Sequence, residues 1–449
     1  MREKSAIWEI IKSIPELDGL NSDKKDNALN FIVKKLNKLS LKIHKSPFEP
    51  QKNGSRFNLN NNFQQAVLSW LRQFDEDQRL GILISVLSLT YITKSELETL
   101  LDISITKFNR ERNLMFERWA EEYFISKELI SSNRNIIPYS LSETAISEDI
   151  KQTAHFSYIK DNKPTEGHFI NLLEKLFHYL RLLADPNVGN STVYKDDDWF
   201  PVVSGILSKL IRSDILIIED CSYSGTTIKS DIKKLIELIK IAFIPYEEVL
   251  KLDSTYVPHF YILLPICTDV ALKEIEQLVF QDAQVAKYFS QISTGYVFDE
   301  GHRFTPGSLP KNMDYLTKIL PDLDLIEKVK KSLKYFHEEY SNIYWTKELL
   351  ERTNMTDLQM QYGYRGGGWA ISTFHNCPNN SLPLYWFPNH PLIGNKVDAL
   401  LKRNEHRSKH DPTLSDKINS DISICVADEE KELKHYLDQF YEKYKRLLS

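Results

Sequence analysis

The segment from Ile215 to Ile228, with the sequence ILIIEDCSYSGTTI, constrains the fold of this chain more than any other part of it. It begins with four consecutive apolar residues, a run that does not alternate and is too short for a helix. Such a run predicts a buried strand of a parallel sheet. Two acids follow, then a short loop with hydroxyls and one glycine, and then the apolar spacing of a helix. The segment therefore predicts the strand, turn and helix of an α/β fold.

The polar residues of this segment are expected at the carboxyl end of the strand, where open α/β sheets bind ligands. Glu219 and Asp220 are paired carboxylates, which can accept hydrogen bonds from the hydroxyls of a ribose. The loop offers hydroxyls and backbone N–H groups at a helix N-terminus, which suit a phosphate. Its residues are Ser222, Tyr223, Ser224, Gly225, Thr226 and Thr227. We therefore expect a ribose-phosphate site here, and the alternative is an ordinary strand and helix joined by a polar turn.

This order of residues resembles the phosphoribosyl-diphosphate motif of type I phosphoribosyltransferases. That motif is an apolar strand, two acids, three variable residues, Thr or Ser, Gly, any residue and Thr. Its defined positions are filled here by Glu219, Asp220, Ser224, Gly225 and Thr227. The resemblance implies a doubly wound, mainly parallel sheet that binds phosphoribosyl diphosphate or a nucleotide. We expect no metal site built by the protein itself, and Mg²⁺ only as an ion that the ligand carries between its diphosphate oxygens.

A second cluster of unusual composition lies near residue 370. Four of the 15 glycines fall within six positions, at residues 363, 366, 367 and 368, which indicates a backbone that turns sharply or approaches another group closely. An apolar strand is predicted from Ala370 to Phe374, and His375, Asn376, Asn379 and Asn380 follow it. The imidazole could act as an acid, a base or a phosphate contact, and the amides could bind base edges or ribose hydroxyls. The alternative is a proline-rich turn whose Asn side chains bond their own backbone.

The glycine- and tyrosine-rich turn, the strand and the sequence His-Asn-x-Pro-Asn-Asn-x-Leu-Pro resemble the PRTase-CE group, phosphoribosyltransferase-like effectors of bacterial conflict systems. The resemblance covers most of residues 65–390. It implies a role in anti-phage defence, in some members beside a retron reverse transcriptase, and so a partner in a reverse transcriptase or nucleic-acid complex. It also implies that Glu219, Asp220 and His375 are catalytic, and that Asn376, Asn379 and Asn380 position the base or the leaving group.

The chain departs from working type I enzymes in its pyrophosphate loop, which in those enzymes is usually glycine-rich with a basic residue. The candidate here is the segment 160–167, KDNKPTEG, where Lys160 and Lys163 could contact phosphate, although loop lysines are more often simply solvated. Glycosidic cleavage of a nucleotide therefore stands beside transfer as the expected reaction at the anomeric carbon. The alternative is a non-catalytic nucleotide-sensing or nucleic-acid-binding component of a defence complex.

Three regions are expected along the chain. Residues 1–135 show mostly helical periodicity, residues 150–400 alternate strands and helices as βαβ units do, and residues 401–449 predict a charged loop and a C-terminal helix. Within the first region, Thr93 with Glu96 three residues later predicts a capping box, and the segment 94–118 predicts two helices with a break near Asp102. Arg110 and Arg112 on the second helix favour a helix-turn-helix that reads DNA, whereas interspersed acids favour a solvated helical hairpin.

Composition excludes several classes of protein. A net charge of −5 gives no general attraction to nucleic acid or anionic membranes. The cysteines at positions 221, 267, 377 and 425 are far apart, which argues against a disulfide framework and a zinc ribbon and fits a reducing compartment. No apolar run approaches the ~20 residues of a membrane-spanning helix, and the N-terminus lacks the features of a signal peptide. We therefore expect a cytoplasmic protein without membrane contacts.

Overall fold

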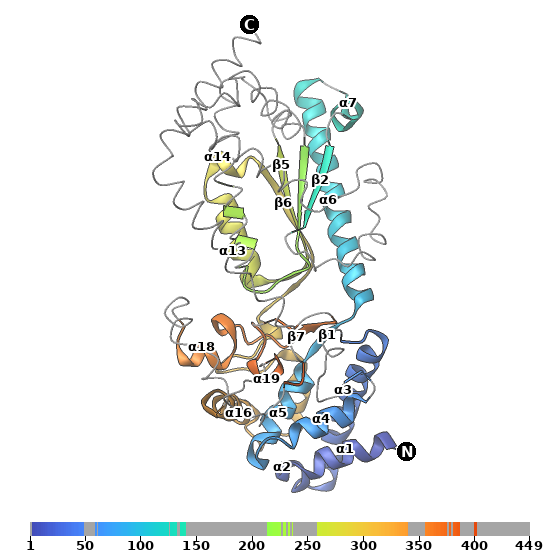
Figure 1. The fold of residues 1–449 in the computed structure, drawn as a ribbon, viewed down its shortest axis with the longest axis vertical. Helices are drawn as coiled ribbons and strands as arrows, with labels where there is room; N and C mark the ends of the chain where they lie inside the picture. Colours follow the sequence, from blue (N-terminus) through green and yellow to red (C-terminus); the bar gives the residue numbers. More distant parts are fainter. Residues whose placement is uncertain are drawn as a thin grey trace, which may run out of the picture. The chain divides into compact units, whose positions relative to one another are not determined.

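The computed structural model of the protein describes residues 2–48, 59–60, 62–124, 126–132, 135–140, 213–225, 228–229, 232–233, 236, 258–339, 355–374, 377–378, 380–386 and 399–401 (Figure 1). The chain forms two compact units. Unit 1 comprises Met1–Leu97 and Phe298–Lys409, and unit 2 comprises Glu98–Val297 and His410–Ser449. Each unit thus combines two stretches that are far apart in the sequence. The three regions expected from the sequence stay a prediction.

Unit 2 contains a sheet of mainly parallel strands. These are β2 (Asn135–Ser140), β3 (Ser213–Ile218), β4 (Cys221–Ser222), β5 (His259–Thr268) and β6 (Phe289–Phe298). β3 pairs in parallel with β2 and with β5, while β4 and β6 also pair with β5. The register along β5 is constant, because Ile215 lies opposite Phe260 and Cys221 lies opposite Ile266. The strand predicted from the apolar run at 215–218 is confirmed.

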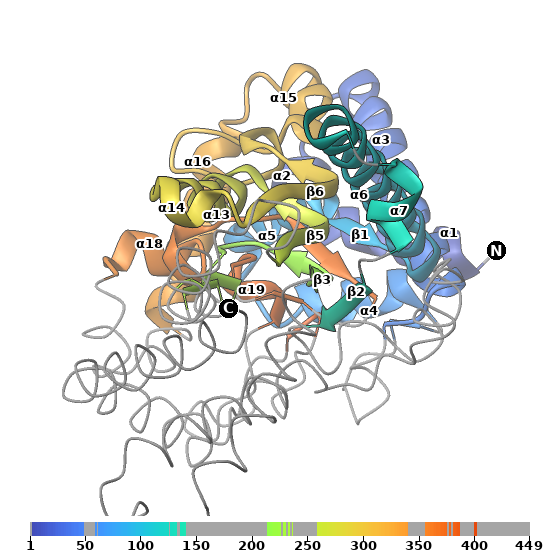
Figure 2. The ribbon, with the colours of Figure 1, turned by 90° about the horizontal axis from the view of Figure 1, so that it is seen from above.

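Helices cover both faces of this sheet, which explains why its central strands are continuously apolar. All ten residues of β5 are buried. Figures 1 and 2 show α6 (Lys94–Tyr123) along one face and α13 (Asp269–Phe280) along the other. On the α6 side, the hydroxyl of Tyr261 donates to Sδ of Met115 at 3.4 Å, and the ring of Phe108 meets that of Tyr261 edge-on at 4.8 Å. The predicted α/β class is confirmed.

α6 is one continuous helix of 30 residues. Both interpretations of the segment 94–118, helix-turn-helix and helical hairpin, require a break near Asp102 and are therefore wrong. The polar residues that suggested a break are accommodated within the helix, since the hydroxyl of Ser104 donates to the carbonyl of Leu100 at 2.9 Å. Arg112, which the DNA-reading interpretation used, instead forms an ion pair with the buried carboxylate of Asp214, with Nε and Oδ2 2.5 Å apart.

Unit 1 is mostly helical. Its α-helices are α1 (Arg2–Lys12), α2 (Pro15–Asp18), α3 (Ser22–Lys45), α4 (Phe63–Leu71), α5 (Glu76–Ser88), α15 (Asp314–Ile319), α16 (Leu325–Glu339), α18 (Asp357–Gln361) and α19 (Pro383–Trp386). Short 3₁₀ helices are η5 (Glu300–His302), η6 (Lys311–Met313) and η8 (Tyr364–Gly366). Two strands, β1 (Thr90–Ile92) and β7 (Ile371–Thr373), pair in parallel, and β7 confirms the strand predicted at 370–374.

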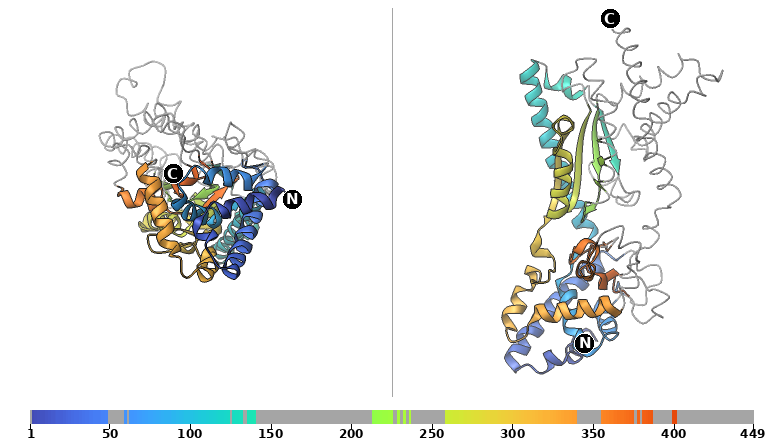
Figure 3. Two further views of the ribbon diagram at one scale, coloured as in Figure 1. Left: turned by 90° about the horizontal axis from the view of Figure 1, so that it is seen from below. Right: turned by 90° about the vertical axis from the view of Figure 1, so that its left-hand side faces the viewer.

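The core of unit 1 is built around α5, which is buried on all sides from Leu80 to Ser88. A helix that is apolar all round is a helix enclosed by others. α16, orange in Figure 3, packs against it at Gly81, where a Cβ atom would overlap the carbonyl oxygen of Lys328. Two side chains bond carbonyl oxygens of α5, since Ser332 donates to Gln78 at 2.9 Å and Tyr385 donates to Ser85 at 2.5 Å. The two sequence stretches of unit 1 therefore share one core.

The turn that precedes α6 has the capping box that the sequence predicts. The amide of Glu96 donates to Oγ1 of Thr93 at 3.2 Å, and the amide of Thr93 donates to Oε2 of Glu96 at 2.9 Å. Lys42 of α3 adds an ion pair, with Nζ 2.6 Å from Oε1 of Glu96. Burial alone would raise the pKa of Glu96, but the hydrogen bonds from Lys42 and Thr93 outweigh it and hold that pKa below its ordinary value.

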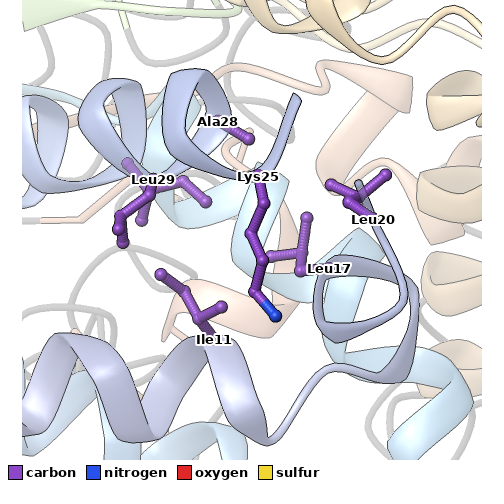
Figure 4. A pocket seen from close by; sticks show the side chains of 7 residues that line it. Ile11, Leu17, Leu20, Lys25, Ala28 and Leu29 are labelled. Carbon is purple, nitrogen blue, oxygen red and sulfur yellow. The ribbon is translucent and has the colours of Figure 1, made fainter. Parts of the chain in front are cut away.

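A small pocket lies among α1, α2 and α3 (Figure 4). Its lining is Ile11, Leu17, Leu20, Lys25, Ala28, Leu29 and Ile32. The one charged group in this lining, the ammonium of Lys25, pairs with Asp18 at 2.8 Å. A ligand site needs several convergent polar groups, so this pocket is a gap between helices. In the described part of the chain, each helix is too short or too polar to traverse a lipid bilayer.

Candidate phosphoribosyl site

The candidate site lies where β3 gives way to β4. Glu219 directly follows β3 and Asp220 directly precedes β4, so the two acids occupy the point at which the named strands are interrupted. Backbone bonds to β5 fix this point on both sides. The amide of Glu219 donates to the carbonyl of Leu263 at 3.1 Å, and the amide of Ile266 donates to the carbonyl of Asp220 at 3.3 Å. The backbone of both acids is therefore fixed by β5.

The surroundings of the two acids leave the adjacent thiol protonated. Asp220 is 8% exposed, and its Oδ1 accepts the amide of Cys221 at 2.7 Å. Burial and the nearby carboxylates of Asp220 and Glu219 raise the pKa of the Cys221 thiol well above its ordinary value. A thiol with a raised pKa is a poor nucleophile at neutral pH. The thiol of Cys221 is therefore not activated as a nucleophile by its surroundings.

The loop that follows is attached to the N-terminus of α13. Thr268 is the N-cap of α13, and its hydroxyl accepts the amide of Ala271 at 3.1 Å. The same hydroxyl donates to the carbonyl of Tyr223 at 2.7 Å. Gly225 has a φ of +68°, and a Cβ atom there would lie 3.3 Å from the carbonyl oxygen of Ala271. Glycine is the residue that takes this conformation without strain, so the geometry of the turn depends on it.

A helix begins at the end of this loop, as the sequence predicts. The amide of Lys229 donates to the carbonyl of Gly225 at 2.9 Å, which is the i to i−4 bond of an α-helix. Residues 228–229, 232–233 and 236 are helical, and the isoleucines among them are buried. The ammonium of Lys229 pairs with Glu274 of α13. The strand, loop and helix order of the first motif is therefore present in unit 2.

The glycine-rich segment belongs to unit 1 and turns sharply. Positive φ angles occur at Gly363 (93°), Gly366 (65°) and Gly368 (62°), and also at Arg365 (56°). At Gly368, a Cβ atom would overlap the carbonyl oxygen of Phe304. The sharp turn and the close approach that the glycine cluster indicated are both confirmed.

Asn380 stabilises this turn. It is 5% exposed, its side-chain amide donates to the carbonyl of Tyr364 at 3.0 Å, and its own carbonyl accepts the amide of Trp369 at 3.2 Å. The side chain thus bonds the backbone of the glycine-rich turn, 16 residues earlier, and not the backbone of its own segment, so the alternative of Asn side chains that bond their own backbone stays a prediction. A role for Asn380 in positioning a base stays a prediction.

Several predicted site residues lie outside the described residues. They are Lys160, Lys163, Thr226, Thr227, His375, Asn376 and Asn379. Their roles stay predictions. Of the described site residues, Glu219 to Gly225 form one continuous segment of unit 2, and Asn380 belongs to unit 1.

An aspartate and histidine pair that the motifs did not indicate lies beside the glycine-rich turn. Oδ1 of Asp299 is 2.9 Å from Nδ1 of His302, and the carbonyl of His302 accepts the amide of Ala370 at 3.3 Å. The hydrogen bond with His302, and then Lys311, hold the pKa of Asp299 below its ordinary value. In the sequence, this pair could have been recognised from an aspartate three residues before a histidine, which is the spacing of a capped turn.

Comparison with known proteins identifies the family. Among the described residues, no group of three or more His, Cys, Asp or Glu side chains is arranged to hold a metal ion. No curated protein and no solved structure matches the chain. The model of the PRTase-CE family matches residues 67–403, which is well over half of the chain and includes both motifs. The chain therefore belongs to the PRTase-CE family and carries a phosphoribosyltransferase-like domain.

Proposed function

We propose that this protein is an effector of an anti-phage defence system that binds a ribose 5-phosphate-type ligand, phosphoribosyl diphosphate or a nucleotide, and acts at its anomeric carbon. The observation that carries the proposal is the segment from Glu219 to Gly225. Two acids there are fixed by β5, and a glycine-dependent turn follows them directly. In a phosphoribosyltransferase-like domain, this arrangement suits a ribose diol and its 5′-phosphate.

The acids would bind the ribose and stabilise the transition state. Reaction at an anomeric carbon develops positive charge on the ring, as in an oxocarbenium ion. The carboxylates of Glu219 and Asp220, held in a partly buried position, would stabilise this charge without having to reorganise. The neighbouring Cys221 thiol stays protonated, so it does not compete as a nucleophile.

The other predicted residues keep the roles that the loop chemistry and the resemblance imply. The loop from Ser222 to Thr227 would hold the 5′-phosphate through backbone N–H groups and hydroxyls. The sequence assigns the other two roles. The base or leaving group would be positioned by His375, Asn376, Asn379 and Asn380, and pyrophosphate would be contacted by Lys160 and Lys163. Carboxylate oxygens are common ligands of Mg²⁺, so Glu219 and Asp220 are compatible with an ion that is carried by the bound phosphoribosyl compound.

Two reactions are consistent with such a site. In transfer, the bond from the anomeric carbon to diphosphate breaks as a bond to an incoming nucleophile forms. In glycosidic cleavage, the bond from the anomeric carbon to the base breaks and water supplies the new oxygen. Both need the same charge stabilisation, so both depend on the two acids.

Asp220→Asn and Glu219→Gln test the reaction. We expect the purified protein to consume phosphoribosyl diphosphate or a nucleotide, measured by mass spectrometry, and each variant to lower the rate by about 10² or more. Glu276→Gln, an exposed position on α13, is the matched control and should keep the wild-type rate. Turnover that survives both site variants would contradict the enzymatic proposal. Ligand binding without any turnover would assign the site to a nucleotide sensor.

The defence role has its own test. Bacteria that carry the protein with its native neighbouring genes should plate phage less efficiently than bacteria that carry the Glu219→Ala/Asp220→Ala variant. Equal plating on the two strains, at matched protein levels, would argue against a defence role for this site.

A further inference from the structure

The second half of α3 carries a concentrated positive charge. Residues 27–45 contain no Asp or Glu, and within them lie Lys34, Lys35, Lys38, Lys42 and Lys45, which we call the lysine face. At about 100° per residue, these five side chains fall within about 100° of the helix circumference. The buried residues of α3 lie on a different side of the helix; they are Ala28, Ile32, Leu36, Leu39 and Ile43. The helix therefore presents one apolar side to unit 1 and one basic side away from that core.

Most of the lysine face lacks acidic partners among the described residues. Other lysines of unit 1 have them: Lys328 pairs with Glu16, and Lys331 pairs with Asp77 at 2.9 Å. On the face itself, Lys42 pairs with Glu96. The other four lysines make no ion pair with any acid in the part of the chain that the structure describes. Burial and the charge of Lys38 lower the pKa of Lys35 to about 8, as expected where positive charges crowd together.

An exposed aromatic ring adjoins this charge. Tyr315 of α15 is 56% exposed, and its ring centroid lies 5.6 Å from that of Phe31 on α3. Nζ of Lys35 lies 5.6 Å from the same Phe31 ring. Asp314 precedes Tyr315, and Lys318 follows within the same helix, so the neighbourhood of the ring is not acidic overall. Lysines beside an exposed aromatic ring are the combination that binds phosphates and stacks a base.

We propose that the lysine face and Tyr315 form a binding surface for single-stranded nucleic acid. The lysines would contact successive phosphates, and a base would stack on Tyr315. A membrane surface fits less well, because insertion needs several exposed apolar residues beside the basic ones, and among the described residues of α3, Leu41 is the one large apolar side chain that is exposed. The overall charge of −5 would make binding local to this face and sensitive to salt. This surface lies in unit 1 and is independent of the proposed ribose-phosphate site.

The test uses the full chain and a fluorescein-labelled single-stranded RNA or DNA of mixed sequence, about 20 nucleotides long, a length that exceeds common single-strand site sizes. Fluorescence anisotropy at several KCl concentrations gives the affinity and its salt dependence. We expect Lys34→Glu/Lys38→Glu to weaken binding about tenfold or more at low salt. Each phosphate contact to a single strand contributes ~0.7 to the slope of log K against log salt concentration. The loss of two contacts in this double variant should therefore reduce that slope by about 1.4. Tyr315→Ala should weaken binding and leave the slope unchanged.

The control reverses the same number of charges elsewhere in unit 1. Lys330→Glu/Lys334→Glu changes two exposed lysines of α16 and should keep the wild-type affinity. Equal weakening by the two double variants would overturn the proposal, as would absence of binding at low salt or a preference for duplex. Asp220→Asn should leave the oligonucleotide affinity unchanged, which separates this proposal from the proposed reaction. The altered lysines are outside the core, and thermal unfolding verifies that the variants fold.

Discussion

The hydroxyl of Thr268 donates to the carbonyl of Tyr223 at 2.7 Å, so the residue that ends β5 fixes the loop that follows β4. The same hydroxyl caps α13 through the amide of Ala271. A single side chain thus joins the proposed phosphate loop to the neighbouring strand and helix. The loop would be shaped before any ligand arrives, which lowers the entropy cost of binding.

Thr268→Val tests this connection. Valine has nearly the same shape but neither donates nor accepts, so both bonds are lost. We expect the free energy of unfolding to fall by about 1–2 kcal/mol and nucleotide or phosphoribosyl diphosphate affinity to decrease. Urea unfolding and ligand titration measure the two effects. Thr268→Ser keeps the hydroxyl and should retain most of the stability and of the ligand affinity. A serine variant with the same losses as the valine variant would show that the methyl group, and not the hydroxyl, is responsible.

Gly225→Ala should strain the loop. The φ of +68° and the close carbonyl of Ala271 both disfavour a side chain, at a cost of about 1–2 kcal/mol. Gly307→Ala is the matched control, because a Cβ atom there has no neighbour within 4 Å. Thermal unfolding should show a lower midpoint for the first variant and a nearly unchanged one for the second. Equal midpoints for the two variants would contradict the strain argument.

Arg112→Ala should destabilise unit 2 strongly. Asp214 is fully buried, and removal of the guanidinium leaves its charge without the ion pair. The expected loss is about 3–5 kcal/mol in the free energy of unfolding, measured in urea. Arg112→Met/Asp214→Leu removes both charges and should be much less destabilised than the single variant. A double variant that is equally unstable would mean that packing, and not charge, dominates at this position.

The carboxylate of Glu96 makes the free energy of unfolding of unit 1 depend on pH. Its folded pKa is below its ordinary value, so its contribution is present above an unfolded pKa of about 4.3 and is lost as pH falls through the folded value. Glu96→Gln should lower stability at pH 7 by less than about 1 kcal/mol, since the carboxylate is partly exposed and screened. The difference from wild type should shrink as pH falls below the unfolded pKa and vanish once pH is below the folded pKa. Urea midpoints at several pH values measure it, and a difference that persists in acid would exclude the charge as its cause.

Secondary structure could be predicted from the sequence where a few neighbouring residues determine it. The apolar run before Glu219 predicted β3, and Thr93 with Glu96 predicted a capping box, because strand burial and capping are each encoded within a few residues. The prediction failed for α6. Asp102 and Ser104 suggested a turn, yet a serine hydroxyl can bond the carbonyl four residues earlier and remain helical.

Contacts between distant residues were beyond prediction from one sequence. The first motif gave Glu219 to Gly225, but Thr268, which fixes that loop, is far along the chain and belongs to no motif. Arg112 carried the charge expected of a DNA reader, and its pairing with Asp214 depends on the tertiary fold. The position of a charge along a helix is visible in sequence, whereas its partner is not.

The enclosed helix α5 has a consequence for how the protein is made. Its surroundings include α16, which is encoded after all the described strands of unit 2. At ~5–20 residues per second, the ribosome delivers α16 tens of seconds after α5 has emerged. During that interval, the nascent chain carries a helix whose residues from Leu80 to Ser88, all buried in the folded protein, have no complete enclosure. Unit 1 therefore finishes folding late in synthesis, and truncation before α16 leaves a chain prone to aggregation.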